Sequence, residues 1–422
     1  MKSTKKVIQL IFLGLFTFSV VFAQSPESYK KRRAEILSRL TDAAALIPSA
    51  WESELESFRQ SNNFFYLTGL EQPELLLLLA PSARSPETLF LPARNLEEGS
   101  MSEAWTGAKL GPGKSTEEQT GIAKTAARNT FDFTFANLAG GLDKLYFDYT
   151  PGPLEGPVSA AEVFLRALRD KYPHLRILPL SRLVDSLRTI KDSVEIRTLQ
   201  QAVDITGASL RETIPQVKAG MFEYEVEALI EYGFTSRGSQ RPGFPSIVGS
   251  GPNTAVLHYD KNRRKIEDGE LVLMDVGAEF DYYSADITRT VPANGRFSGR
   301  QLEIYQIVLE AQKAGIKAVR PGVTLKEVHQ AARTVIETAG YGQYFIHYTS
   351  HFLGLDVHDV GSRDIPLGPG MIITVEPGIY IPGEALGVRL EDDVLVTADG
   401  CRVLSASIPK EVREIETLMQ SK

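Results

Sequence analysis

The sequence predicts an α+β protein in which a smaller α/β domain precedes a larger second domain. The chain has 422 residues, of which 43% are hydrophobic and 23% charged, a soluble composition that is too long for one typical domain. Short apolar runs alternate with helical spacing up to about residue 188. Beyond that residue, amphipathic helical segments flank two strand pairs that repeat each other, so we place the two domains at 24–188 and 189–422.

The first 23 residues have the pattern of a signal peptide. Three lysines among the first six residues precede an apolar run over 7–22, and Ala23 is the small residue expected at a cleavage site. An uncleaved anchor is the alternative, but the run is shorter than the ~20 apolar residues that a membrane span needs. We therefore expect an exported protein, periplasmic or secreted, without stable membrane insertion after cleavage.

Charge and cysteine content exclude two classes of protein. The formal net charge is −7, which argues against a nucleic-acid partner because clustered Lys and Arg hold phosphate backbones. The single cysteine, Cys401, excludes an intramolecular disulfide. The hydrophobic core must therefore hold each domain together.

The segment 24–188 contains several short apolar runs bounded by Pro, Gly or charged residues. This pattern predicts buried strands at 74–81, 87–93, 144–149 and 176–180. The spacing of apolar residues over 159–172 predicts a helix before the last of these strands.

The segment 189–422 contains four stretches with helical spacing. One begins near residue 190, and the others span 222–236, 300–319 and 324–339. The last is the best marked, because Thr324 and Glu327 have the spacing of a capping box and Gly340 follows the run. His329 lies on this helix beside its apolar stripe, and we interpret it as a structural histidine.

The two strand pairs carry the same pattern of glycines and acids. "GELVLMDVG" at 269–277 and "GMIITVEPG" at 370–378 each place an acid six residues after one glycine and two before another. If each copy turns back as a hairpin, Asp275 would face Asp286, and Glu376 would face Glu391. The repeat would then bring four carboxylates to one place.

Four clustered carboxylates need an explanation in terms of charge. Opposed strand residues have Cβ atoms ~5 Å apart, where two unit charges repel by roughly 3 kcal/mol at an effective dielectric near 20. Either several acids are protonated or cations neutralise them. An exposed acidic edge is the alternative, and it suits Asp392 and Asp393 but not acids that end buried strands.

The histidines favour a metal or catalytic site. Three of the six, His347, His351 and His358, lie within twelve residues, and His258 is a fourth candidate. Carboxylates and imidazoles without a thiolate suit divalent ions, Mn²⁺ first and Co²⁺, Fe²⁺ or Zn²⁺ next. Two such ions ~3.5 to 4 Å apart activate a shared water and polarise the bond that it attacks.

These stretches resemble the pita-bread metallopeptidases, and most closely the Xaa-Pro aminopeptidase (aminopeptidase P) and prolidase group. The matching motifs are "MDVGAEFDYYSADITRT", "SHFLGLDVHDVG", "TVEPGIY" and "VRLEDD", with "FPSIVGSGPNTAVLHY" upstream. The resemblance implies a pita-bread (creatinase/aminopeptidase) fold over about residues 190–422. "NNFFYLTGLEQPE" and "EAWTGAKLG" also resemble the smaller N-terminal domain of that group.

The resemblance implies roles for individual residues. The five metal ligands would be Asp275, Asp286, His351, Glu376 and Glu391, with Asp286 and Glu391 bridging two ions. His258 and His358 would contact the scissile carbonyl or stabilise the tetrahedral intermediate, while Glu376 would shuttle a proton. Residues on the substrate side would be His347, Arg389 and Trp105. The group usually has glycine where this chain has Tyr348, which concerns the shape of the pocket beside His347.

The activity that the resemblance implies is hydrolysis of the Xaa-Pro bond at the N-terminus of peptides by a metal-bridging hydroxide. A pocket can select such bonds because proline has no N–H and a fixed φ. The alternative in the same class is an Xaa-Pro dipeptidase, or prolidase; methionine aminopeptidases share the metal site but usually lack the N-terminal domain. A non-catalytic pita-bread binding module is the remote alternative, marked by loss of ligands. The expected partners are peptides with proline at the second position, and we expect a homodimer or homotetramer.

Overall fold

The computed structural model describes residues 24–51, 58–93, 109–149 and 155–420. These residues form two compact units, and the division falls between Leu180 and Ser181. The predicted signal peptide at 1–23 and Trp105 lie outside the described residues. Within the described ranges, no helix combines the length and the apolar character needed to cross a lipid bilayer.

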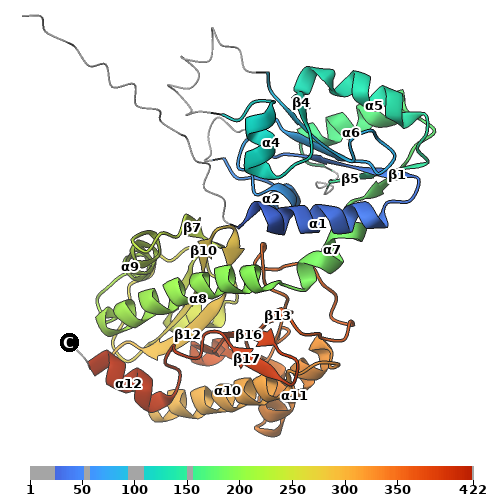
Figure 1. The fold of residues 1–422 in the computed structure, drawn as a ribbon. Helices are drawn as coiled ribbons and strands as arrows, with labels where there is room; N and C mark the ends of the chain where they lie inside the picture. Colours follow the sequence, from blue (N-terminus) through green and yellow to red (C-terminus); the bar gives the residue numbers. More distant parts are fainter. Residues whose placement is uncertain (1–23, 52–57, 94–108, 150–154, 421–422) are drawn as a thin grey trace, which may run out of the picture. The chain divides into compact units, whose positions relative to one another are not determined.

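The first unit is built on a six-stranded mixed sheet with the order β4-β3-β2-β1-β5-β6 (Figure 1). The strands are β1 (Ala43–Pro48), β2 (Leu76–Leu79), β3 (Glu87–Leu91), β4 (Thr125–Ala127), β5 (Lys144–Phe147) and β6 (Arg176–Pro179). In the middle of the sheet, β1 pairs antiparallel with β2 and parallel with β5. All four predicted strands contain an observed one, whereas β1 and β4 were not predicted.

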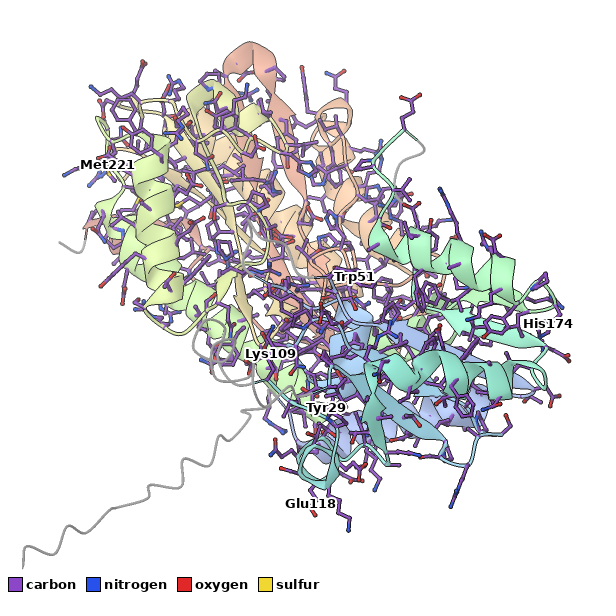
Figure 2. The ribbon with its side chains drawn as sticks, turned by 90° about the horizontal axis from the view of Figure 1, so that it is seen from above. Tyr29, Trp51, Lys109, Glu118, His174 and Met221 are labelled. Carbon is purple, nitrogen blue, oxygen red and sulfur yellow. The ribbon has the colours of Figure 1, made fainter. Side chains whose placement is uncertain are left out.

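Helices pack against this sheet and complete its core. They are α1 (Pro26–Arg39), α2 (Asn62–Thr68), α4 (Lys114–Thr120), α5 (Phe131–Ala139) and α6 (Ala160–Lys171). The predicted helix at 159–172 is α6, which begins at a capping box formed by Ser159 and Glu162. Tyr29 of α1, labelled in Figure 2, is fully buried, and its ring fills the space where a Cβ on Gly69 would lie.

The second unit contains the remaining α-helices of the described residues. They are α7 (Ser181–Thr189), α8 (Ser193–Thr213), α9 (Glu223–Thr235), α10 (Gly299–Ala318), α11 (Leu325–Thr338) and α12 (Val412–Gln420). The four predicted helices correspond to α8 through α11, and the predicted capping box of Thr324 and Glu327 is confirmed at the start of α11. Helices α8 and α9 lie on one side of the strands, and α10 and α11 lie on the other (Figure 1).

The observed division lies before helix α7, whereas the predicted boundary lies after residue 188, near the end of this helix. This helix belongs with the second unit because Arg188 at its end donates to Asp356 at 2.7 Å and also to Asp359. Pro179 lies just before the observed division, whereas no Pro or Gly stands at the predicted boundary after residue 188.

The strands of the second unit form several small sheets between these helices. They are β7 (Arg241–Pro242), β8 (Ile247–Ser250), β9 (Leu271–Val276), β10 (Ala278–Phe280), β11 (Tyr283–Ser284), β12 (Ile287–Pro292), β13 (Ile372–Val375), β14 (Gly378–Ile381), β15 (Leu386–Arg389), β16 (Asp392–Val396) and β17 (Cys401–Val403). The two repeated segments pair as β9 with β12 and β13 with β16, both antiparallel.

The register of the first hairpin differs from the predicted one by two residues. Asp275 lies opposite Thr288, not opposite Asp286. The turn is displaced because Asp281 and Tyr282 both adopt a left-handed conformation, with φ of 46° and 72°, as in a two-residue hairpin turn. Since side chains alternate with period two, a shift of two residues keeps both acids on the same face.

The second hairpin has the predicted register. Val375 pairs with Asp392 on one side of the acids and Gly378 pairs with Arg389 on the other, which places Glu376 opposite Glu391.

The glycine that follows each acid by two residues is required by close packing. A Cβ on Gly277 would lie 1.8 Å from the carbonyl oxygen of Ala285, and one on Gly378 would lie 2.4 Å from the Tyr380 hydroxyl oxygen. Both copies of the repeat therefore need a residue without a side chain at this point.

Candidate metal centre

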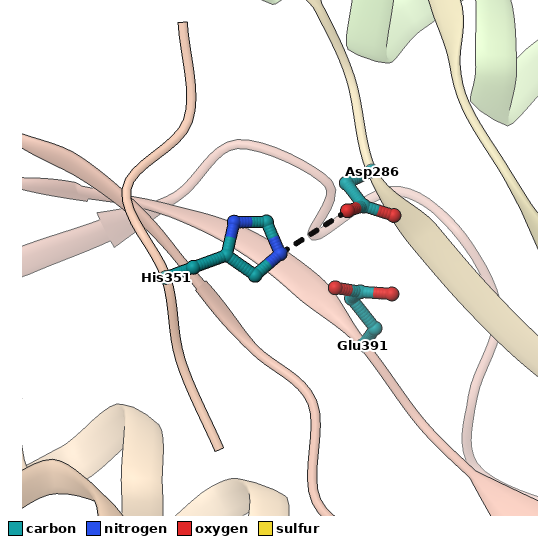
Figure 3. Close-up of side chains that lie close together, drawn as sticks. All are labelled: Asp286, His351 and Glu391. Carbon is teal, nitrogen blue, oxygen red and sulfur yellow. Dashed lines mark ion pairs between the residues drawn. The ribbon is translucent and has the colours of Figure 1, made fainter. Parts of the chain in front are cut away.

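The five side chains implied as ligands all line one cavity of about 480 Å³ in the second unit. Three of them, Asp286, His351 and Glu391, point toward one another (Figure 3) and offer ligand atoms within 4.8 Å of each other. His351 Nε2 is 3.3 Å from Asp286 Oδ2 and 3.7 Å from Glu376 Oε1. The structure thus brings together residues that are far apart in the sequence.

The orientation of His351 is set by the backbone around it. Its Nδ1 lies 3.0 Å from the carbonyl oxygen of Phe352. Since a carbonyl can only accept, Nδ1 carries a proton, and Nε2 is the ring nitrogen that faces Asp286 and Glu376 and can offer a lone pair to a metal ion. A lone pair facing two carboxylates is repulsive unless a proton or a metal cation lies between them.

The carboxylates of the cavity are buried and repel one another. Asp286 is 6% exposed and Glu391 is 1% exposed. Burial first, and then the neighbouring carboxylates, raise the pKa of both groups well above their usual values. Burial also raises the pKa of Glu376, to about 7.

One oxygen of the cluster lacks a partner altogether. Asp275 Oδ1 is buried and accepts no hydrogen bond from any residue that the structure describes. Divalent cations take carboxylate oxygens and imidazole nitrogens as ligands. The unpaired oxygen of Asp275, the other carboxylates and the Nε2 of His351 are such ligands. The residues present therefore suit a metal centre.

Arg389 supplies a buried positive charge beside the cluster. It is 2% exposed and donates to Asp275 Oδ2 at 2.6 Å and to the hydroxyl of Thr288 at 3.1 Å. The Thr288 hydroxyl in turn donates to Glu391 Oε2 at 2.7 Å. One guanidinium therefore orients an acid from each hairpin.

Tyr380 connects Arg389 to His347, and sequence reasoning did not single it out. Arg389 donates to the Tyr380 oxygen at 2.9 Å, and the Tyr380 hydroxyl lies 2.9 Å from His347 Nε2. His347 Nδ1 lies 2.8 Å from the carbonyl oxygen of Tyr348, so Nδ1 is the donor and Nε2 accepts from Tyr380. The position of Tyr380 in the motif "TVEPGIY" was the available signal.

His347 is expected to make the metal-free protein less stable in acid. Burial and the charge of Arg389 lower the pKa of His347 to about 3, against about 6.5 when unfolded. The unfolded chain therefore binds more protons below pH 6.5, and this group costs roughly 2 kcal/mol between pH 7 and pH 5.

Urea unfolding of the metal-free protein at these two pH values measures the effect. The variant His347→Gln should lose about 2 kcal/mol less than the unmodified chain on acidification. The raised pKa of Glu376 makes the fold more stable on acidification, which opposes the effect of His347. The quantity to compare is therefore the change in unfolding free energy of one protein minus that of the other. Equal losses in both proteins would contradict the assignment.

His258 and His358 lie on loops at the edge of the same cavity. The ring of His358 meets that of His351 edge to face, with centroids 4.4 Å apart. Burial and the neighbouring His351 and His258 lower the pKa of His358, so its ring is neutral near pH 7. The loop is braced by Asp359, which is paired with Arg188 and Lys191.

Asp392 and Asp393 are not part of an exposed acidic edge, and that interpretation was wrong. Both are fully buried. Asp392 is held by Arg289 at 2.8 Å, by Lys410 and by the hydroxyl of Ser405; burial raises its pKa, but these two cations outweigh burial and lower it. Asp393 accepts the backbone N–H of Asp286 at 3.2 Å and so supports a metal ligand from behind.

Tyr348 packs at the rim of the cavity. Its ring stacks on His329 with centroids 4.6 Å apart, and the guanidinium of Arg363 lies 3.9 Å from its centre. His329 Nδ1 lies 3.0 Å from the hydroxyl of Thr349, which agrees with a structural role. Trp105 lies outside the described residues, so its place relative to the site stays a prediction.

Comparisons with known proteins match both units. The family described as Metallopeptidase family M24 matches residues 197–398, and Aminopeptidase P, N-terminal domain, matches 29–146. The Xaa-Pro aminopeptidase of Haemophilus influenzae is 34% identical over 93% of this chain and 97% of its own length. The structure of Escherichia coli aminopeptidase P with the inhibitor Pro-Leu is 32% identical with a TM-score of 0.84, covering 94% of this chain and 98% of that chain.

One relative from the dipeptidase group also matches. The Xaa-Pro dipeptidase of Pyrococcus furiosus is 41% identical over 226 residues, which are 53% of this chain and 64% of that protein.

Proposed function

Since the chain belongs to metallopeptidase family M24 and carries an aminopeptidase P N-terminal domain, we propose that it hydrolyses the Xaa-Pro bond at the N-terminus of peptides with two divalent metal ions. The observation that carries this proposal is the one cavity lined by four carboxylates and by His351, whose Nε2 lies 3.3 Å from Asp286 and 3.7 Å from Glu376. None of the five ligand positions is substituted, which argues against the binding-module alternative.

The five ligands suit Mn²⁺ first, and Co²⁺, Zn²⁺ or Fe²⁺ otherwise. Asp275, Asp286, His351, Glu376 and Glu391 would hold the ions. Bound ions would supply an activated water and would polarise the carbonyl of the scissile bond.

The remaining residues of the site would orient the peptide and move its protons. His358, whose ring is neutral near pH 7, can donate a hydrogen bond to the developing oxyanion, and His258 faces the same cavity. Glu376, with a pKa of about 7 before metal binds, can pass a proton to the prolyl nitrogen as the bond breaks. His347 and Arg389 would shape the pocket for the proline ring.

An Xaa-Pro dipeptidase is the second candidate. It is favoured by the 41% identity to the Pyrococcus furiosus dipeptidase, which exceeds the identity to the aminopeptidases but covers about half of this chain. The match to the aminopeptidases over nearly the whole chain supports the first candidate. Export to the periplasm or beyond, and a homodimer or homotetramer, remain proposals supported by the N-terminal segment and by the family resemblance.

Chelation and peptide length together test the function. The purified protein should hydrolyse Ala-Pro-Ala, lose this activity after removal of metal, and regain it with Mn²⁺, because the cluster needs cations to bind and attack. Ala-Ala-Ala serves as the control and should be cleaved poorly. Faster cleavage of Ala-Pro than of Ala-Pro-Ala would favour the dipeptidase, and unchanged activity after stringent chelation would overturn the metal-dependent proposal.

A further inference from the structure

We propose that Glu223 and Tyr259 are positioning residues that fix His258 at the edge of the metal cavity. The inference rests on the proposed function in one respect, namely the contact of His258 with the substrate. It concerns a buried carboxylate and a tyrosine that line no part of the cavity themselves.

Glu223 is the centre of a hydrogen-bond network. It is fully buried at the first position of α9, and both of its oxygens are used. Oε1 accepts from the backbone N–H of Ser250 at 2.7 Å, from its hydroxyl at 2.8 Å and from Asn253 at 3.0 Å. Oε2 accepts from the Tyr259 hydroxyl and from the backbone N–H of Arg264, both at 2.8 Å.

These five hydrogen bonds all come from one stretch of chain. The donors lie within 250–264, which connects β8 to β9 and includes His258. Besides these five donors, the network has the positive end of the α9 dipole and the guanidinium of Arg264, which donates to the Ser250 hydroxyl at 3.1 Å. The network therefore fixes the conformation of the loop 250–264.

The loop is anchored differently on the two sides of His258. Upstream, the N–H of Gly387 donates to the Thr254 hydroxyl at 2.7 Å. A Cβ on Gly387 would lie 1.9 Å from the Thr254 carbonyl oxygen, so this side is packed against β15. Immediately downstream of His258, the anchor is the hydrogen bond from Tyr259 to Glu223.

His258 depends on these anchors for its position. It forms no hydrogen bond or ion pair of its own among the residues that the structure describes, and its side chain is exposed at the cavity. The orientation of its ring therefore follows from the backbone on either side. Loss of the Tyr259 hydroxyl would release one side of His258 while the packing of Thr254 on Gly387 remains.

The variant Tyr259→Phe tests the proposal with the smallest possible change. We expect kcat for Ala-Pro-Ala to fall about 10- to 100-fold, because a small misplacement of a catalytic group has effects of this size, while KM and metal content stay nearly constant. In the background of His258→Ala, the same change should cost no further activity, since Tyr259 then has no catalytic group to position.

The matched control is Tyr305→Phe. Tyr305 is fully buried whereas Tyr259 is partly buried, but Tyr305 likewise donates one hydrogen bond, to the carbonyl oxygen of Lys410 at 2.7 Å, and does not line the cavity. Its replacement should leave kcat unchanged. An equal loss of kcat in the two variants, or an unchanged kcat in Tyr259→Phe, would overturn the positioning role.

A spectroscopic measurement is independent of the activity. The chain has six histidines, so His258→Ala identifies the imidazole signal of His258 in a ¹H–¹³C NMR spectrum. In Tyr259→Phe this signal should shift and sharpen toward that of a mobile side chain, while those of the other five stay in place. If it does not move, the inference is wrong even if the protein is an aminopeptidase; if Ala-Pro-Ala is not cleaved by the unmodified protein, only the proposed function fails.

Discussion

Replacing Asp286 with asparagine is expected to lower kcat/KM for Ala-Pro-Ala by at least about 1000-fold, which corresponds to about 4 kcal/mol of transition-state stabilisation. The reason is that Asp286 offers a ligand atom within 4.8 Å of those of His351 and Glu391. An amide supplies one neutral oxygen in place of a carboxylate, so metal should bind more weakly. Metal analysis of the purified variant should show less than the stoichiometry of the unmodified protein.

The same substitution should stabilise the metal-free protein. Burial and the charges of Asp275, Asp393 and Glu376 raise the pKa of Asp286, which shows that its ionised form is disfavoured in the fold. Removing that charge removes repulsions of up to roughly 3 kcal/mol per close pair. Urea unfolding should therefore show a gain of about 1 to 3 kcal/mol without metal and little further gain when Mn²⁺ is added.

Asp281→Asn is the matched control for this variant. Asp281 lies at the tip of the same hairpin with φ of 46°, a conformation that asparagine adopts readily. This variant should keep its activity and its metal content. The metal-centre assignment would be refuted by an Asp286→Asn protein that binds two ions and cleaves the peptide at the normal rate.

Replacing Arg389 with methionine should damage both stability and activity. Without its guanidinium, the buried Asp275 carboxylate loses its charged partner, and breaking a buried ion pair in this way costs about 3 to 5 kcal/mol. Saturating Mn²⁺ should recover part of this stability, because a cation can replace the lost charge. It should not recover kcat/KM, which we expect to remain at least about 100-fold low because Tyr380 and Thr288 lose the donor that orients them.

The variant Arg33→Met separates the loss of stability from the loss of activity. Arg33 is fully buried and is paired with Glu87 at 3.1 Å, but it lies in the first unit. Its loss should destabilise the protein by a similar amount, measured by urea unfolding, and leave kcat/KM of the folded protein within about threefold. Recovery of full activity in Arg389→Met with excess Mn²⁺ would show that Arg389 only balances charge.

The internal repeat predicted the convergence of the acids but not the register of both hairpins. Each acid is followed by a glycine whose packing is visible only in three dimensions, yet the spacing of glycine and acid is plain in the sequence. The first register was missed because it depends on left-handed conformations at Asp281 and Tyr282. Neither residue is a glycine, and "FDYYS" has none of the Asn-Gly or Asp-Gly signals that mark such turns.

The burial of Asp392 and Asp393 could not be predicted from the local sequence pattern. Three acids in a row, Glu391 to Asp393, are typical of an exposed turn, and the residues that neutralise Asp392 are Arg289 and Lys410, which lie 103 and 18 residues away. Tyr380 was missed for a related reason, since its contacts run to side chains of separate segments. The predicted fold class is confirmed. It could be predicted because helix and strand periodicity are local properties of the sequence and because the motifs resemble those of a known family.

The contacts of Asp392 have a consequence for the order in which the protein is completed during synthesis. Arg289 also donates to the carbonyl oxygens of Ile408 and Pro409, so the segment that carries Lys410 is bound directly behind the acids. In a growing chain that has not yet been synthesised past Lys410, Asp392 lacks its contact with Lys410. Arg289 likewise lacks the carbonyl oxygens to which it donates. The catalytic half should therefore reach its mature form only after the segment that carries Lys410 has been synthesised and has docked on Arg289 and Asp392.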